Sequence, residues 1–165
     1  MAPKSSNMTT LIGSNLYNAS PYYNASPYFS TNMTPLDMTV VDGNQLQIFS
    51  SNINSDLLKI INNKIKSNPK VNTITGTYVT DIQCKLSEID EELIDRIKIV
   101  NFPNLENITS ETFKNTHIEE AYLPKLKILP NSIFYQCTKL KKVDISNAEI
   151  IGDQAFYLCS ELDNL

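Results

Sequence analysis

The C-terminal part of this 165-residue chain repeats one phrase three times. The phrases are FPNLENITSETF, LPKLKILPNSIF and ISNAEIIGDQAF, and they end at Phe113, Phe134 and Phe156. These phenylalanines are 21 and 22 residues apart, a period that is typical of solenoid repeats. A coil of this length has too little apolar surface to fold alone, so the repeat predicts stacked coils that bury one another's apolar sides.

Each coil opens with three apolar residues at positions one, four and six of a short strand. We expect these strands to be parallel and to stack at roughly 4.8 Å. Three residues before each repeated phenylalanine stands Ser110, Asn131 or Asp153, a side chain that can cap a short helical turn. Thr116, Cys137 and Cys159 follow three residues after it, so these residues and the phenylalanines together form a second inward column, opposite the strands. The strand triples are Ile97, Val100, Phe102; Ile118, Ala121, Leu123; and Leu140, Val143, Ile145.

A Phe three positions ahead of a Cys, followed by Leu and by an apolar, x, apolar strand, resembles the BspA-type leucine-rich repeat. The resemblance covers residues 97–165, although Thr116 replaces the cysteine of the first coil. It implies an α/β solenoid, a short leucine-rich-repeat stack with parallel strands and short helical turns, that serves protein or glycan binding rather than catalysis. The last coil is incomplete at Leu165, so we expect further coils, a distal domain or a neighbouring subunit to cover its edge.

Residues 1–40 form a low-complexity segment rich in Asn, Ser, Thr, Pro and Tyr, in which the hexapeptide YNASPY occurs twice in succession. Such a segment buries too little apolar surface to offset its ordering entropy. It is therefore either a flexible linker or an extended arm that docks into a larger assembly. The anchors of a docking arm are its regularly spaced tyrosines, Tyr17, Tyr22, Tyr23 and Tyr28.

Residues 41–96 are predicted to form an α+β N-terminal cap for the repeats. Alternating residues around Asp42-Gly43 predict a hairpin. Ser55 is placed to cap a helix that ends before Asn68-Pro69. Ser87 is placed to cap a second helix, SEIDEELIDR. The apolar face of the first helix carries Leu57, Leu58, Ile61 and Ile65.

The outward side of the repeat strands is the best candidate binding surface, because alternate strand residues point away from the core on every coil. Tyr122 is the expected contact residue, and Glu120 and Lys142 are expected to lie side by side on neighbouring strands and can pair. The alternative is that these are ordinary solvent-facing side chains. The candidate residues are Ile99, Asn101, Glu120, Tyr122, Lys142 and Asp144.

The chain contains no nucleophile, phosphate-loop or zinc motif. His117, the only histidine, is interpreted as a turn residue. The acidic cluster from Glu88 to Asp95 lacks the spacing and the glycine of a calcium loop, so it is interpreted as a solvated helix face. Cys137 and Cys159 share a slot on adjacent coils, within reach of a disulfide, although small buried side chains are the favoured interpretation. We predict no catalytic, cofactor-binding or metal site, and no enzyme.

A net charge of −4 and a pI near 5.0 leave no basic surface for nucleic acid. The sequence also lacks an apolar run long enough to span a membrane and the apolar region of a classical signal peptide.

The favoured function is that of a non-catalytic structural or attachment protein. Its arm docks into a larger assembly, such as a virion or phage particle, and its repeats mediate protein interaction. Its partners are then proteins of that assembly and further copies of the chain, at a virion or extracellular surface. The alternative is a cell-surface or secreted leucine-rich-repeat adhesin of a bacterium or protist.

Overall fold

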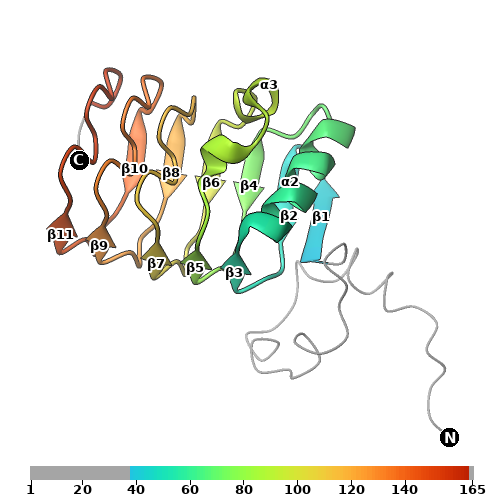
Figure 1. The fold of residues 1–165 in the computed structure, drawn as a ribbon, viewed down its shortest axis with the longest axis horizontal. Helices are drawn as coiled ribbons and strands as arrows, with labels where there is room; N and C mark the ends of the chain where they lie inside the picture. Colours follow the sequence, from blue (N-terminus) through green and yellow to red (C-terminus); the bar gives the residue numbers. More distant parts are fainter. Residues whose placement is uncertain (1–37, 164–165) are drawn as a thin grey trace, which may run out of the picture. The chain divides into compact units, whose positions relative to one another are not determined.

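The computed structural model describes residues 38–163, whose strands form two rows along a stack of coils (Figure 1). One row is a six-stranded sheet in the order β1-β2-β4-β6-β8-β10, and all its neighbours are parallel except β1 and β2. The other row consists of a three-stranded sheet, β3-β5-β7, and a two-stranded sheet, β9-β11. The strands of the first row are β1 (Thr39–Asp42), β2 (Gln45–Ile48), β4 (Thr73–Thr75), β6 (Ile99–Asn101), β8 (Glu120–Tyr122) and β10 (Lys142–Asp144). Those of the second are β3 (Asn52–Ile53), β5 (Asp81–Ile82), β7 (Asn107–Ile108), β9 (Ile128–Leu129) and β11 (Ile150–Ile151).

The core begins with the middle residues of the six-stranded sheet, which are paired in register from coil to coil. Leu46 pairs with Ile74, Ile74 with Val100, Val100 with Ala121, and Ala121 with Val143. The first four are buried, and Val143 is partly buried. Because one apolar side chain per coil faces inward at the same height, the sheet supports a continuous apolar row.

The three repeated phenylalanines form a second column in the core, as the sequence predicts. The ring centroids of Phe113 and Phe134 are 5.1 Å apart, and those of Phe134 and Phe156 are 5.4 Å apart, with an angle of 11° between the ring planes in each pair. Phe113 and Phe134 are fully buried and Phe156 is partly buried. The registered coils predicted for this part of the chain are therefore confirmed.

The helical turns predicted around these phenylalanines are wrong. Each segment forms a tight turn with two residues of left-handed backbone, placed two positions before and two positions after the phenylalanine. In this conformation alternate amides point to the next coil, so Phe113 donates to the carbonyl of Ile133 (3.0 Å) and Phe134 to that of Ala155 (2.8 Å). These hydrogen bonds between coils replace those within a helix. The left-handed residues are Glu111, Asn115, Ser132, Gln136, Gln154 and Leu158, with φ between 56° and 62°.

The predicted hairpin is present, and its two-residue loop is Gly43-Asn44. Asp42 pairs with Gln45, and Gly43 has a φ of 59°, which suits the first loop position of a type II′ turn.

Helix α2 (Ser55–Ser67) is also present, but its N-cap is Asn54 and not Ser55. The Asn54 side chain accepts hydrogen bonds from the amides of Asp56 (3.2 Å) and Leu57 (3.0 Å). The helix ends at Asn68, and the Arg96 guanidinium donates to the carbonyls of Ile65 (2.8 Å) and Pro69 (2.9 Å) near that end. Its four predicted inward residues, Leu57, Leu58, Ile61 and Ile65, are buried.

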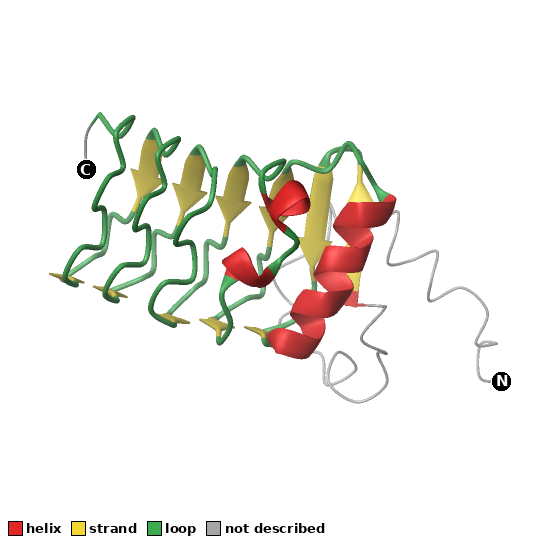
Figure 2. Cartoon of the chain, turned by 45° about the horizontal axis from the view of Figure 1, so that its top comes forward, coloured by secondary structure: helices red, strands yellow, loops and turns green. Residues whose placement is uncertain are grey.

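The second predicted helix is replaced by two shorter elements (Figure 2), η5 (Leu86–Glu88) and α3 (Glu91–Ile94). The extended backbone at Ile89, with ψ of 145°, interrupts the helical path between them. Asp90 then precedes α3 without a capping hydrogen bond from its side chain. Burial of Ile89 explains the interruption, because the extended backbone lets its side chain reach the core.

The boundary predicted at residue 97 is not a boundary of the sheet. Strands β2 and β4 continue the six-stranded sheet in register with β6, so residues 45–96 add two coils to the stack. These two coils are longer, because the inward residues Leu46, Ile74 and Val100 are 28 and 26 residues apart. The extra residues contain α2 in one coil and η5 with α3 in the other, where the later coils have the phenylalanine turn.

Candidate interaction surfaces

The predicted strand-face residues lie together on the outward side of β6, β8 and β10. Ile99, Glu120 and Lys142 form one row across the three strands, and Asn101, Tyr122 and Asp144 form another. All six alternate with the inward residues Val100, Ala121 and Val143, and none is fully buried. The geometry predicted for this surface is confirmed, and its use in binding stays a prediction.

Tyr122 is the centre of a three-residue cluster on this face. Its hydroxyl donates a hydrogen bond to the Glu120 carboxylate. The Lys142 ammonium lies 3.2 Å from the same hydroxyl and 5.0 Å from the ring centroid. The hydrogen bond with Tyr122 and the nearby negative groups raise the pKa of Lys142. Glu120 and Lys142 are register partners as predicted, but Lys142 reaches Tyr122 and not the carboxylate.

A row of alternating charges runs beside the strand face; Lys98, Glu119 and Lys141 each stand one residue before a strand, and Lys139 and Glu161 extend the row. Glu119 lies 2.8 Å from Lys141 and 3.8 Å from Lys98, and Glu161 lies 2.7 Å from Lys139 and 3.9 Å from Lys141. The hydrogen bond from Lys141 lowers the pKa of Glu119. Sequence reasoning missed this row, although its signal was available: Lys98, Glu119 and Lys141 recur at the repeat spacing with alternating sign.

A tyrosine column on the turn side of the stack was also missed. Tyr135 and Tyr157 directly follow their core phenylalanines, and their rings stack with a centroid distance of 5.2 Å. Lys114, which occupies the same slot one coil earlier, lies 5.2 Å from the Tyr135 centroid. Hydrogen bonds from Lys114 and Lys85 lower the pKa of Glu111 to about 2. Tyr157, which stacks on Tyr135, remains 50% exposed.

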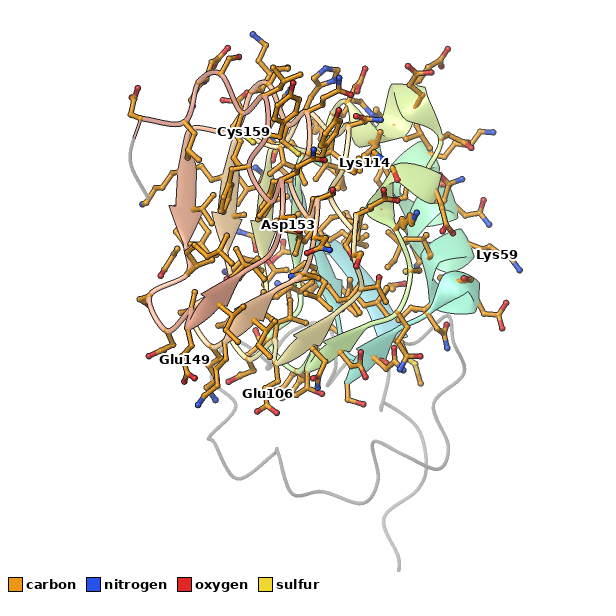
Figure 3. All side chains as sticks on the ribbon, turned by 60° about the vertical axis from the view of Figure 1, so that its left-hand side comes forward. Lys59, Glu106, Lys114, Glu149, Asp153 and Cys159 are labelled. Carbon is orange, nitrogen blue, oxygen red and sulfur yellow. The ribbon has the colours of Figure 1, made fainter. Side chains whose placement is uncertain are left out.

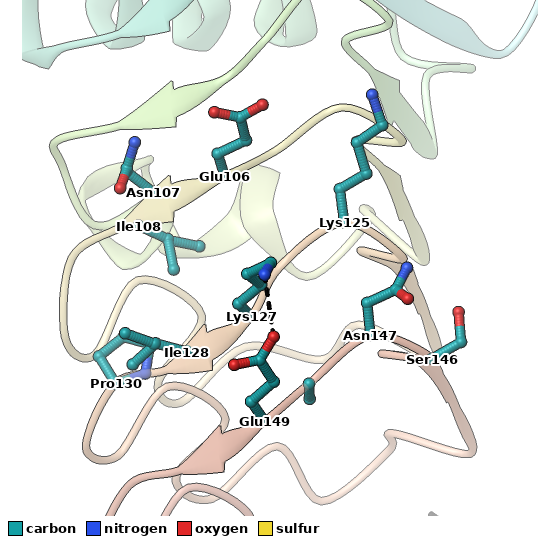
Figure 4. A pocket seen from close by; sticks show the side chains of 11 residues that line it. Glu106, Asn107, Ile108, Lys125, Lys127, Ile128, Pro130, Ser146, Asn147 and Glu149 are labelled. Carbon is teal, nitrogen blue, oxygen red and sulfur yellow. Dashed lines mark hydrogen bonds and ion pairs between the residues drawn. The ribbon is translucent and has the colours of Figure 1, made fainter.

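A shallow groove of about 1000 Å³ lies over β7, β9 and the segment that leads into β11 (Figure 4). We call it the Ile128 groove. Ile128 is 57% exposed, and its register partner Ile150 is 56% exposed. Lys127 and Glu149 form an ion pair of 2.9 Å within the groove. Sequence reasoning missed this groove, although two isoleucines that recur at a strand slot occupied by Asn107 one coil earlier were a usable signal.

The cysteines lie in the core or at its margin, and all three are free thiols. Burial raises the pKa of Cys84 and Cys159 to about 11 and also raises that of Cys137. The thiol of Cys137 donates to the carbonyl of Phe113 (2.8 Å), and that of Cys159 to the carbonyl of Phe134 (3.0 Å). Neutral thiols engaged in this way are poor nucleophiles, because the thiolate is the reactive form. Cys137 and Cys159, with the buried Thr116, belong to the predicted second column.

The remaining candidates for chemistry have structural partners. His117 lies after the turn at residues 111–115 and directly before Ile118, and its Nδ1 contacts the Asp95 carboxylate. Within residues 38–163, His, Cys, Asp and Glu side chains form no group of three suited to a metal ion. None of the helices described there has the length and apolar character of a membrane span. The four tyrosines of the arm, Tyr17, Tyr22, Tyr23 and Tyr28, lie outside the described residues.

The sequence was compared with known families, curated proteins and solved structures. The family model described as "BspA type Leucine rich repeat region (6 copies)" matches residues 81–165, so the match begins upstream of the predicted start at residue 97. No curated protein and no solved structure shows a significant match. The stacked phenylalanines, the parallel strands in register and the family match agree: this chain belongs to the BspA-type leucine-rich-repeat family.

Proposed function

We propose that this chain is a non-catalytic interaction protein whose repeats bind a protein partner on the outward face of β6, β8 and β10. The observation that supports this proposal is the cluster of Glu120, Tyr122 and Lys142. Tyrosine is enriched among residues that dominate binding energies at protein interfaces. Here its ring and its hydroxyl are already held by neighbours, so little side-chain entropy is lost when a partner docks.

The chemistry of the surrounding face favours a protein partner. The outward positions on β2 and β4 are occupied by Gln and Thr, and those on β10 carry one lysine and one aspartate. With Glu120 on β8, the face carries two negative charges and one positive charge among neutral polar groups, a mixture that suits the polar rim of a protein interface. It does not provide the basic surface that phosphate backbones require.

The proposal extends to the N-terminal arm. In this proposal the arm, shortened to residues 1–37 because Thr39 and Val40 pair within β1, docks into a larger assembly, such as a virion or phage particle, and Tyr17, Tyr22, Tyr23 and Tyr28 serve as anchors. The support is compositional: the segment is Tyr- and Pro-rich and carries two consecutive copies of YNASPY. The protein would then act at a virion or extracellular surface, with its repeats available to a second partner.

Site-specific photocrosslinking in the source organism tests the strand face. A photoreactive residue at Asn101 of the full chain should crosslink one defined protein, and Tyr122→Ala should abolish that crosslink. The matched control carries the same photoreactive residue at Lys59, on the exposed side of α2. Equal crosslinking from both positions, or none from Asn101, contradicts the proposal.

Deletion of residues 1–37, which leaves strand β1 (Thr39–Asp42) intact, tests the arm separately. The shortened chain should lose incorporation into the assembly while its repeats retain the crosslink from Asn101. Normal incorporation of the shortened chain would reject the docking role.

A further inference from the structure

We propose that the Ile128 groove is a homotypic interface on which a second copy of this chain docks. The groove lies over the second row of strands, whereas the function proposed above uses the outward face of the six-stranded sheet. The inference therefore goes beyond that function, and the two can fail independently.

The second row of strands has an outward apolar slot that the fold itself does not require. The outward residues of the second row are Asn52, Asp81, Asn107, Ile128 and Ile150, and the first three are polar. The inward residues Ile82 and Leu129 of these strands are fully buried, whereas Ile151, the counterpart of Leu129 on the last strand β11, is 52% exposed. Ile128 is exposed although a further strand, β11, lies beside it, and an exposed isoleucine in a slot that tolerates Asn and Asp indicates contact with another surface.

The groove carries equal numbers of positive and negative side chains. Its four charged side chains are Glu106, Lys125, Lys127 and Glu149, so the groove is neutral overall. Lys127 and Glu149 neutralise each other through their ion pair. Within the described part of the chain, the side chains of Glu106 and Lys125 have no hydrogen bond or ion pair. The groove thus offers one available charge of each sign beside an apolar centre (Figure 4).

The charge of the chain and of the groove favours a second copy of this chain as the occupant. The chain carries a net charge of −4, so contact between arbitrary faces of two copies is opposed by repulsion. A neutral groove with one available cation and one available anion removes that opposition. In a two-fold pair every contact between the copies occurs twice. Lys125 of each copy can therefore pair with Glu106 of the other. Figure 3 shows Glu106 and Glu149 along one edge of the fold, well separated from Lys59 on α2.

Sedimentation velocity of the full chain tests the proposal, at concentrations from about 10 μM to about 1 mM because a small interface gives weak association. The wild-type chain should shift from monomer toward dimer. Glu106→Lys and Lys125→Glu should each lower the association constant about tenfold or more, because each brings like charges together. The double variant, which swaps the two charges, should recover it to within about threefold.

Ile128→Thr tests the apolar centre of the groove, and Ile150→Thr tests its exposed register partner beside the groove, because threonine keeps the β-branched shape that the strands favour. Each should weaken dimerisation without lowering the midpoint of thermal unfolding. The charge control is Asp56→Lys on α2, which changes the net charge as much as Glu106→Lys and replaces a side chain that is 89% exposed. It should leave association unchanged.

Three results would overturn the proposal. The wild-type chain can remain monomeric at every concentration. Association can persist in all groove variants, which would assign it to another face or to residues 1–37. The charge-swapped double variant can fail to recover, which would mean that Lys125 and Glu106 do not pair across a two-fold interface.

Discussion

Replacement of the middle phenylalanine of the core column gives the sharpest test of the fold. Phe134 is fully buried and stacks on Phe113 and Phe156, at 5.1 and 5.4 Å. Truncating a buried phenylalanine to alanine costs about 3–5 kcal/mol, and stacked aromatic pairs contribute about 0.5–1.5 kcal/mol each. Because this ring loses two stacking partners, we expect Phe134→Ala to lower the free energy of unfolding by about 4–5 kcal/mol, the upper part of that range.

Phe156 provides the internal comparison. It stacks on one described ring, Phe134, and it is only partly buried. Phe156→Ala should therefore cost about 2 kcal/mol, roughly half as much. Phe134→Leu keeps most of the apolar volume and should cost about 1–2 kcal/mol, so it gives a measurable value if the alanine variant does not fold.

Urea titrations of the full-length variants measure these differences. The chain has no tryptophan, so far-UV circular dichroism and tyrosine fluorescence are the suitable signals, and their coincidence tests two-state unfolding. The ranking decides the question. If Phe156→Ala costs as much as Phe134→Ala, or if both cost less than about 1 kcal/mol, the stacked column does not stabilise the coils as argued.

Local contacts lead to four further predictions. Asn54→Ala should destabilise α2 by about 1 kcal/mol and Ser55→Ala should have little effect, because Asn54 is the residue that caps the helix; thermal unfolding with amide exchange in α2 distinguishes them. Alkylation of Cys84 and Cys159 should be slow at neutral pH and accelerate toward pH 11, where mass spectrometry of labelled peptides should show ionisation near the raised pKa of about 11. The same shift means that the fold loses stability as pH rises from about 9 toward about 11, since thiols ionise first in the unfolded chain. Glu119→Gln should reduce stability slightly at neutral pH, where the carboxylate with its lowered pKa is ionised and pairs with Lys141. Well below pH 4.5 the wild-type carboxylate is protonated as well, so the variant should then be as stable as the wild type. Unfolding measured at both pH values, with and without high salt, checks this.

The later coils were predictable because their inward positions recur at nearly constant spacing. Phe113, Phe134 and Phe156 gave both the period and the column. The earlier coils escaped prediction because helical elements lengthen them, so Leu46 and Ile74 fall out of the 21- to 22-residue period while remaining in the same inward row. A constant period finds coils of equal length, whereas sheet register tolerates insertions between the strands.

The errors at the turns have a different cause. Ser110, Asn131 and Asp153 resemble helix caps, but the backbone conformation is set by hydrogen bonds to the neighbouring coil, which a local pattern does not contain. Left-handed residues are usually Gly or Asn, and here only Asn115 carries that signal. Leu158 and Glu111 adopt the same conformation without any local indication of it.

Of the candidate surfaces, the strand face could be predicted from the sequence and the Ile128 groove was not. The strand face was predicted residue by residue, because alternation along a strand fixes which side chains point outward. The partner of Lys142 was not, because the aromatic ring of Tyr122 competes successfully with the Glu120 carboxylate for the ammonium group. The Ile128 groove required the second row of strands, which two-residue segments do not reveal by periodicity.

The direction of the hydrogen bonds at the phenylalanine turns also bears on how the chain is made. The amides of Phe113 and Phe134 donate to carbonyls that occur about 20 residues later in the chain, and the ribosome has not yet released these when the turns emerge. At translation rates of about 5–20 residues per second, each turn waits about 1–4 seconds for its acceptors. Each coil thus completes its hydrogen bonds only after the next coil has been synthesised. The most recently made coil is the one exposed to chaperones or to premature contacts with other nascent chains.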